Sequence, residues 1–133
     1  SHGMITGYHN HHTEFIPFPD GTLPYYLLFD NTDQDVVVQL DNGNALKGDG
    51  KIYDIPVRYP GRMTTIHLKP YSFTNGYDSM IGEDDIDLNR FVSLCQQHSN
   101  TDWFIVEYES KKLYAPMAGV ELCYKQMVKL GLI

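Results

Sequence analysis

Four side chains that can bind a metal ion stand near the ends of four separate apolar runs. They are His9, Asp41, His67 and Glu107, and the intervals between them are 32, 26 and 40 residues. These intervals are close to the roughly 31 residues that one repeated strand–helix unit occupies. A mixed set of imidazole and carboxylate groups suits Mn²⁺, Co²⁺, Zn²⁺ or Mg²⁺. The spacing therefore predicts a divalent metal site with one ligand from each of four units.

Each of these residues also has a purely structural interpretation. A single histidine on a strand, such as His67, is most often a hydrogen-bonded structural group. Asp41 stands directly before Asn-Gly and is equally suited to capping a turn. Glu107 lies within Phe-Ile-Val-Glu-Tyr, where a carboxylate costs several kcal/mol unless it is paired or metal-bound. The four positions taken together favour a common site.

Further polar residues accompany the four candidate ligands. His11 and His12 share a polar segment with Glu14, where the histidines are suited to solvent exposure or to contacts with metal ligands. Lys69 follows the third candidate closely and could neutralise a substrate oxyanion, or serve only as a surface cation. The acidic run at residues 83–85 is more typical of a helix N-terminus than of a site.

The apolar runs have the composition of strands in a parallel sheet. Residues 36–40 are β-branched and show no helical period, which fits a strand that is buried on both faces. We expect strands at residues 4–8, 36–40, 63–68 and 102–108, each ending beside one candidate ligand.

Between these runs the apolar residues follow a helical spacing. We expect helices at residues 23–30, from Leu88 onwards after a cap at Asp85 or Asp87, and at 115–130, with at most a short helix within 52–59. Residues 42–44, 48–50 and 74–81 have the composition of loops. The alternation predicts an α/β fold with a parallel sheet and right-handed crossovers. The C-terminal ends of such strands meet at one rim, so the candidate ligands should converge there.

The composition is that of one globular domain. The chain has 133 residues, of which 42% are hydrophobic and 13% aromatic, enough for a real core. Residues 1–3 have the sequence of an expression-tag remnant, so we expect a single domain at residues 4–133.

Charge and cysteine content limit the partners and the compartment. The 10 basic residues are scattered among 17 acidic ones, which gives a net charge of −7 and argues against nucleic acid. The apolar runs are too short to cross a bilayer, so we expect no membrane partner and a cytoplasmic location. Cys95 and Cys123 lack a CxxC spacing, and we expect reduced thiols on the core side of helices, with a disulfide as the alternative.

Five motifs in order resemble one enzyme family. They are Gly7-Tyr8-His9-Asn10-His11 with Glu14-Phe15, Gln39-Leu40-Asp41 with Gly43-Asn44-Ala45, Tyr59-Pro60-Gly61-Arg62 leading to Ile66-His67-Leu68-Lys69, Gly82-Glu83 before Ile86-Asp87, and Trp103-Phe104-Ile105-Val106-Glu107. Together they resemble the xylose-isomerase-like sugar phosphate isomerase/epimerase family over almost the whole chain. The resemblance implies half of a (β/α)8 TIM barrel, whose four units match strands five to eight of the family.

The resemblance also implies roles for the candidate residues. Asp41, His67 and Glu107 match metal ligands of the family, and Glu107 matches one of its paired proton-transferring glutamates. His9 stands where the best-known epimerases have the other glutamate, as it does in a Tyr-His-Asn-His subgroup, and could serve as ligand or base. Pro70 replaces an aspartate that commonly follows the His-Leu-Lys run.

The implied reaction is metal-assisted proton transfer next to a carbonyl through a cis-enediol, on a small carbohydrate or polyol. Glu107 would remove the proton, with His9 as the second candidate for catalysis. His11, Glu14 and Lys69 are the candidate substrate contacts, and Glu14 could also complete the shell of the ion.

Four strand–helix units leave two strand edges and one apolar sheet face uncovered. We therefore expect a homodimer or a complementary half-barrel as partner. The alternative is a non-catalytic half-barrel that serves as a binding or assembly module. A third possibility is a small metalloprotein outside this family.

Overall fold

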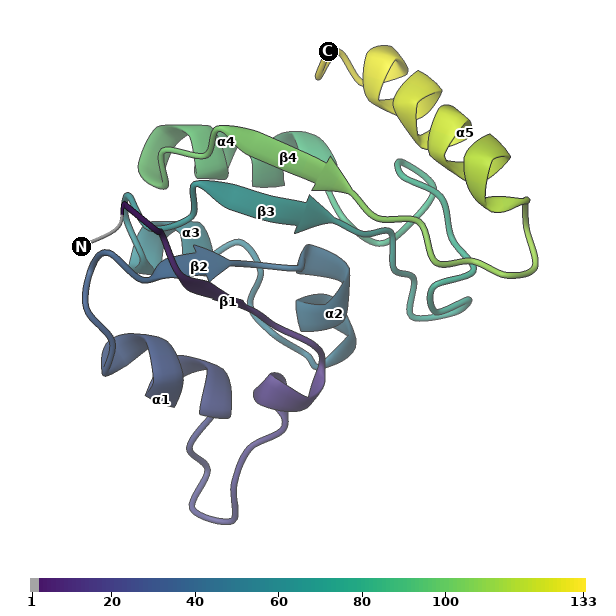
Figure 1. Cartoon of the computed structure of the whole chain (residues 1–133). Helices are drawn as coiled ribbons and strands as arrows, with labels where there is room; N and C mark the ends of the chain where they lie inside the picture. Colours follow the sequence, from purple (N-terminus) through teal and green to yellow (C-terminus); the bar gives the residue numbers. More distant parts are fainter. Residues whose placement is uncertain (1–2) are drawn as a thin grey trace.

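The computed structural model describes residues 3–133 and has strands and helices in alternation (Figure 1). The elements are β1 (Gly7–His9), the 3-10 helix η1 (Thr13–Phe15), α1 (Pro24–Asp30), β2 (Val37–Gln39), α2 (Asn42–Lys47), α3 (Ile55–Arg58), β3 (Thr65–Leu68), α4 (Leu88–His98), β4 (Trp103–Val106) and α5 (Pro116–Lys129). The order confirms the predicted α/β fold.

The four described strands run parallel in the order of the chain. β1 pairs with β2, and β3 pairs with β4, each in parallel register. Between the two pairs, the His67 amide donates to Leu40 O at 2.9 Å, and an isolated parallel bridge joins Asp41 to His67. The Val38 amide also donates to Arg62 O at 2.8 Å. All four strand ends therefore face the same rim.

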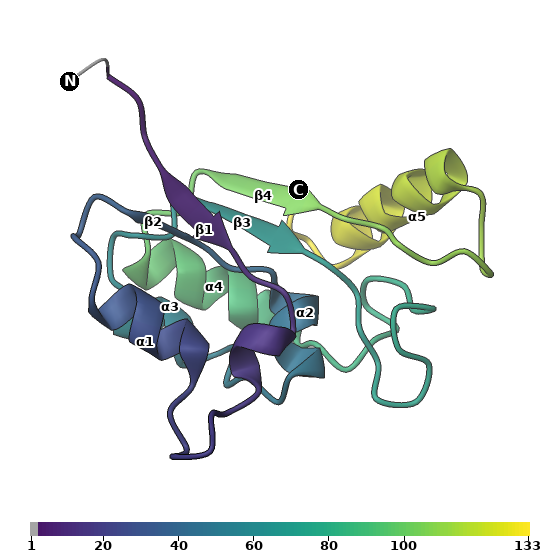
Figure 2. The ribbon, with the colours of Figure 1, turned by 60° about the horizontal axis from the view of Figure 1, so that its bottom comes forward.

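Helices α1, α3 and α4 lie along one side of the strands, and the described chain leaves the other side open (Figure 2). Val38 and Ile66 point to the helices and are fully buried, as are Phe91 and Cys95 on the inner face of α4. α4 begins where the side chain of Asp87 accepts a hydrogen bond from the Arg90 amide, which confirms one of the two predicted caps.

The open face of the sheet carries the alternate residues of each strand. Gln39 and Thr65 are partly exposed there, and their side chains share a hydrogen bond of 2.8 Å. On β4, Trp103 is 69% exposed and Ile105 is 38% exposed. In a closed barrel these side chains would point inward.

One segment differs from the sequence expectation. Residues 42–44 belong to α2 and not to a loop, because the preceding Asp41 accepts a hydrogen bond from the Asn44 amide and starts the helix. Gly43 is also needed there, since a Cβ at this position would lie 2.4 Å from Lys69 O. Asn and Gly suggested a turn, yet they satisfy a helix N-terminus that packs tightly against the end of β3.

The structure also bears on the expected strand bounds, the state of the two cysteines and the first residues of the chain. The strands are shorter than predicted, and β1 begins at Gly7. Within the described residues, Cys95 and Cys123 are buried free thiols. Ser1 and His2 of the expected tag remnant lie outside the described residues. Among residues 3–133, no helix is long and apolar enough to cross a membrane.

Candidate metal centre

The rim of the sheet brings together one titratable side chain from each strand end. His9 is the last residue of β1, Asp41 follows β2, His67 lies within β3, and Glu107 follows β4 directly. One nitrogen or carboxylate oxygen from each of the four lies within 4.8 Å of those from the other three. Residues almost a hundred positions apart thus form one cluster, as parallel strands with a common direction require.

Two pairs make up the cluster. His67 Nδ1 lies 2.7 Å from Glu107 Oε2, within hydrogen-bonding distance. His9 Nε2 lies 3.6 Å from Asp41 Oδ2. The pairs are joined by the imidazoles of His9 and His67, whose ring centroids are 4.4 Å apart.

Asp41 is held in place from both sides. Its Oδ1 accepts from the Asn44 amide and its Oδ2 from Asn44 Nδ2, each at 2.8 Å. Asn10 pairs with the Asp41 backbone, accepting from the amide at 2.9 Å and donating to the carbonyl at 3.2 Å. Sequence reasoning missed both asparagines as functional candidates, although they stand inside two of the quoted motifs.

Lys69 lies inside the cluster, where its side chain is only 3% exposed. Its Nζ is 3.0 Å from Glu107 Oε1, 2.9 Å from Glu109 Oε2 and 3.6 Å from Asp41 Oδ2. The ring of Tyr77 covers the ammonium at 4.8 Å. Of the expected surface or rim position for Lys69, the surface position is wrong, since the buried side chain lies at the rim. Glu109 and Tyr77 also contact this group, and the sequence did not suggest them.

Burial and charge shift the pKa values of these groups. Burial raises the pKa of Asp41 to about 6 and is also the main reason that the pKa of His9 is lowered. Burial alone would raise the pKa of Glu107, but hydrogen bonds from His67 and Lys69 outweigh it and lower that pKa. Glu107 is thus an ionised carboxylate at neutral pH.

The polar loop after β1 lies beside the cluster. The carboxylate of Glu14 accepts hydrogen bonds from the Tyr8 hydroxyl and, at 3.0 Å, from the His11 amide. The His11 ring stacks edge-on against His9, with centroids 5.5 Å apart. Glu14 therefore fixes the conformation of the loop. Neither His11 nor Glu14 belongs to the four-residue cluster.

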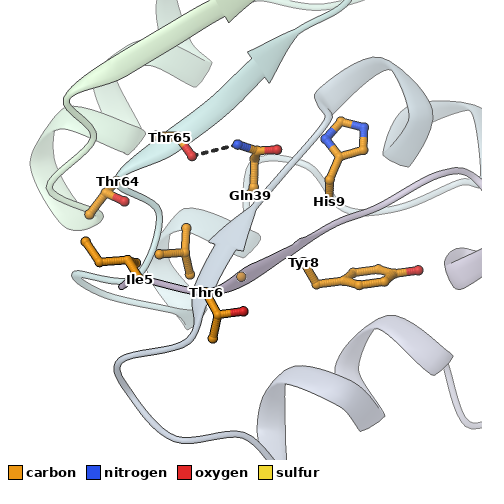
Figure 3. Close-up of a pocket in the computed structure, with 9 residues that line it drawn as sticks. Ile5, Thr6, Tyr8, His9, Gln39, Thr64 and Thr65 are labelled. Carbon is orange, nitrogen blue, oxygen red and sulfur yellow. Dashed lines mark hydrogen bonds between the residues drawn. The ribbon is translucent and has the colours of Figure 1, made fainter. Parts of the chain in front are cut away.

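A pocket of about 390 Å³ runs along the open face of the sheet from His9 towards the beginnings of β1 and β3 (Figure 3). It is lined by Ile5, Thr6, Gly7, Tyr8, His9, Val37, Gln39, Thr64 and Thr65. The Gln39 side chain lies between Thr65 and His9. Of the four cluster residues only His9 borders this pocket, so the cluster lies at its rim end.

The cluster fits a divalent cation in its chemistry. One possible ligand atom from each of the four residues lies within 4.8 Å of those of the other three. Two imidazoles and two carboxylates are donors that Mn²⁺, Co²⁺ and Zn²⁺ accept.

Comparisons with known proteins agree with this architecture. No protein-family model and no curated protein matches the chain. Among solved structures, it is similar to a sugar phosphate isomerase/epimerase from Parabacteroides distasonis, with 26% identity and a TM-score of 0.78 over 94% of this chain and 45% of that one. A second sugar phosphate isomerase/epimerase from that bacterium gives 20% identity and a TM-score of 0.78, over 92% of this chain and 45% of the other.

The resemblance stated from the motifs is therefore confirmed at the level of structure. The chain has the fold of part of a sugar phosphate isomerase/epimerase barrel and spans just under half the length of the structures it matches. The described residues do not form a closed barrel.

Proposed function

We propose that this chain carries the divalent-cation centre of a sugar isomerase or epimerase and moves a proton next to a substrate carbonyl. The observation that carries this proposal is the convergence of His9, Asp41, His67 and Glu107 within 4.8 Å at the strand ends. The similarity to sugar phosphate isomerase/epimerase structures supports the reaction class. The substrate class is a small carbohydrate or polyol.

The bound ion would polarise the carbonyl and neighbouring hydroxyl oxygens of the substrate. Glu107 is the base in this proposal, because its carboxylate is ionised and fixed by both His67 and Lys69. It takes the proton from the carbon next to the carbonyl, which leaves a cis-enediolate, and holds this proton for return to the substrate. His9, whose lowered pKa favours the neutral imidazole, is the second candidate for proton transfer.

Substrate contacts come from the rim. His11 and Glu14 are two of the proposed contacts, because the His11 ring lies against His9 and Glu14 accepts a hydrogen bond from the His11 amide. Lys69 is the third candidate, since its ammonium is close to the Glu107 carboxylate.

In this proposal a partner covers the open face of the sheet. Trp103 and Ile105 expose apolar surface on that face, and the matched barrels have about twice the length of this chain. A second copy of the chain is the partner that we propose, because it would bring an equivalent open face.

Metal analysis tests the central point. The purified chain, dialysed against Mn²⁺ and then against buffer, should retain about one ion per chain by elemental analysis. His67→Ala removes a donor without touching the Asn10 and Asn44 contacts, and should abolish retention. His98→Ala, at the exposed end of α4, is the matched control and should leave it unchanged. An ion-free parent protein would refute the proposal.

A second candidate function is a non-catalytic half-barrel that serves in binding or assembly. The exposed sheet face favours it, since the same surface that a barrel encloses is free to pair in this chain. A single assay distinguishes the catalytic function from the non-catalytic one. Exchange of a carbon-bound substrate proton with deuterated water, in the presence of Mn²⁺, requires the catalytic function.

A further inference from the structure

The buried ammonium of Lys69 adds a positive charge to a cluster that is proposed to hold a cation. Nζ is 3.0 Å from Glu107 Oε1 and 3.6 Å from Asp41 Oδ2, which are both candidate ligand groups. A buried charge of this kind is strongly unfavourable unless it is paired. The same charge would repel a divalent ion held by these carboxylates.

Charge balance shows which side chain can neutralise the Lys69 ammonium when a cation is bound. The carboxylates of Asp41 and Glu107 together balance the two charges of a divalent ion. Once they do so, the remaining partner of Lys69 is Glu109, whose Oε2 lies 2.9 Å from Nζ. The side chain of Glu109 is 45% exposed and is not one of the four clustered donors.

Two further contacts hold the Lys69 side of this pair in place. Tyr77 covers the Lys69 ammonium at 4.8 Å and donates a hydrogen bond from its hydroxyl to Asn44 Oδ1. Asn44 in turn donates to Asp41. The ammonium therefore cannot move away from the carboxylates without breaking packing on the loop after β3, and its charge must be balanced where it stands.

We propose that Glu109 is a positioning residue of the metal centre, which acts through Lys69 by neutralising its ammonium. This inference rests on the proposed function. Glu109 is not one of the four clustered donors, so its effect on metal affinity is indirect. In this arrangement Asp41 and Glu107 balance the charge of the cation, and Glu109 balances the charge of Lys69.

Calorimetric titration of the chain with Mn²⁺ tests the inference. Glu109→Gln keeps the size of the side chain but removes its charge, and should weaken Mn²⁺ binding about 10- to 100-fold, as the loss of groups that support metal ligands typically does. Glu121→Gln is the matched control, since Glu121 forms an exposed pair with Lys125 at 2.7 Å. It should change the affinity less than about twofold.

A double-mutant cycle shows whether the effect passes through Lys69. In a Lys69→Met background, Glu109→Gln should change Mn²⁺ affinity less than about twofold, because no ammonium remains to be neutralised. Should Lys69→Met not fold, Glu109→Asp replaces this arm and should restore most of the affinity that Glu109→Gln loses. Unchanged affinity in Glu109→Gln, or an equal loss in both backgrounds, overturns the inference alone. A parent chain that binds no Mn²⁺ overturns the proposed function as well.

Discussion

At the scale of single residues, the geometry of the cluster depends on neutral side chains as much as on charged ones. Asn44 contacts Asp41 with both its amide and its side chain, and accepts a hydrogen bond from Tyr77. Asn10 fixes the backbone of Asp41 from the first strand unit. Both asparagines are buried. They hold a fully buried carboxylate, which would otherwise be free to rotate away from its neighbours.

Replacement of Asn44 tests this support. Asn44→Ala should weaken Mn²⁺ binding about 10- to 100-fold and lower the free energy of unfolding by about 1–3 kcal/mol, because it removes the side-chain hydrogen bonds to buried Asp41, to the Asn10 carbonyl and from Tyr77. Asn31→Ala is a suitable control, since its side chain donates only to the Leu27 carbonyl on the exposed end of α1. Equal Mn²⁺ affinity in Asn44→Ala and the parent would show that Asp41 needs no such support.

Asp84 gives a prediction on pH that is independent of the metal centre. Burial raises its pKa from 3.8 to about 6. The folded state thus binds this proton more tightly than the unfolded state. The stabilisation is complete below about pH 4 and is lost as the pH rises through about 6. A shift of about two units corresponds to about 3 kcal/mol at most, and partial exposure reduces this to about 2 kcal/mol.

Asp84→Asn has no charge to gain, so its free energy of unfolding should fall about 2 kcal/mol less than that of the parent between pH 4 and pH 7. Urea unfolding at a series of pH values, without added metal, measures the difference. Parallel curves for the two proteins would mean that Asp84 is solvated in the folded state.

At the scale of elements, α2 shows how one short helix positions the site. Its N-cap is Asp41, and its first turn packs against the backbone of Lys69 at the end of β3. The six-residue helix therefore links Asp41, a member of the cluster, to Lys69, which lies beside the cluster. Its register depends on Gly43, since a Cβ there would lie 2.4 Å from Lys69 O.

Gly43→Ala should push α2 away from β3. We expect a loss of about 1–3 kcal/mol in the free energy of unfolding, together with weaker Mn²⁺ binding by the folded protein. Gly61→Ala is the matched control, because Gly61 has a φ of +73°, which a residue with a Cβ rarely adopts, and it precedes β3 at the opposite end of the strand from the cluster. It should lower stability but leave Mn²⁺ affinity unchanged. A loss of affinity in both variants would indicate general unfolding.

The elements differ in how well the sequence predicted them. The helix from Leu88 and the strand at 36–40 could be predicted because their apolar periods are set by burial against the core, which the structure confirms. α2 could not, because Asn42, Gly43 and Asn44 prefer turns and become helical through contacts with distant residues. The convergence of four strand ends follows from parallel topology. The contacts of Glu109 and Tyr77 with Lys69 could not be predicted in this way. They depend on loop conformations, and loops have no periodic pattern of apolar residues.

At the scale of the whole molecule, α1, α3 and α4 cover one side of the strands and leave the other open (Figure 2). Trp103 and Ile105 are exposed on this open face, and no described strand pairs with the outer edge of β4 or of β1. Unpaired edges and exposed aromatic surface favour association. The solved structures that the chain matches are about twice as long, so about half of their length has no counterpart in this chain.

We therefore expect the chain to self-associate through the open face, and Trp103 is the residue that tests this expectation. A buried tryptophan removes about 150–250 Å² from water, so Trp103→Lys should weaken a dimer at least about tenfold. The side chain is 69% exposed in the isolated chain, and its replacement should change the free energy of unfolding of the protomer by less than about 1 kcal/mol. Val57→Lys, on the exposed side of α3, is the control that should leave the dimer intact. Sedimentation equilibrium at micromolar concentration measures all three proteins. A parent chain that sediments as a folded monomer would contradict the expectation, since the open face would then be stable in water without a partner.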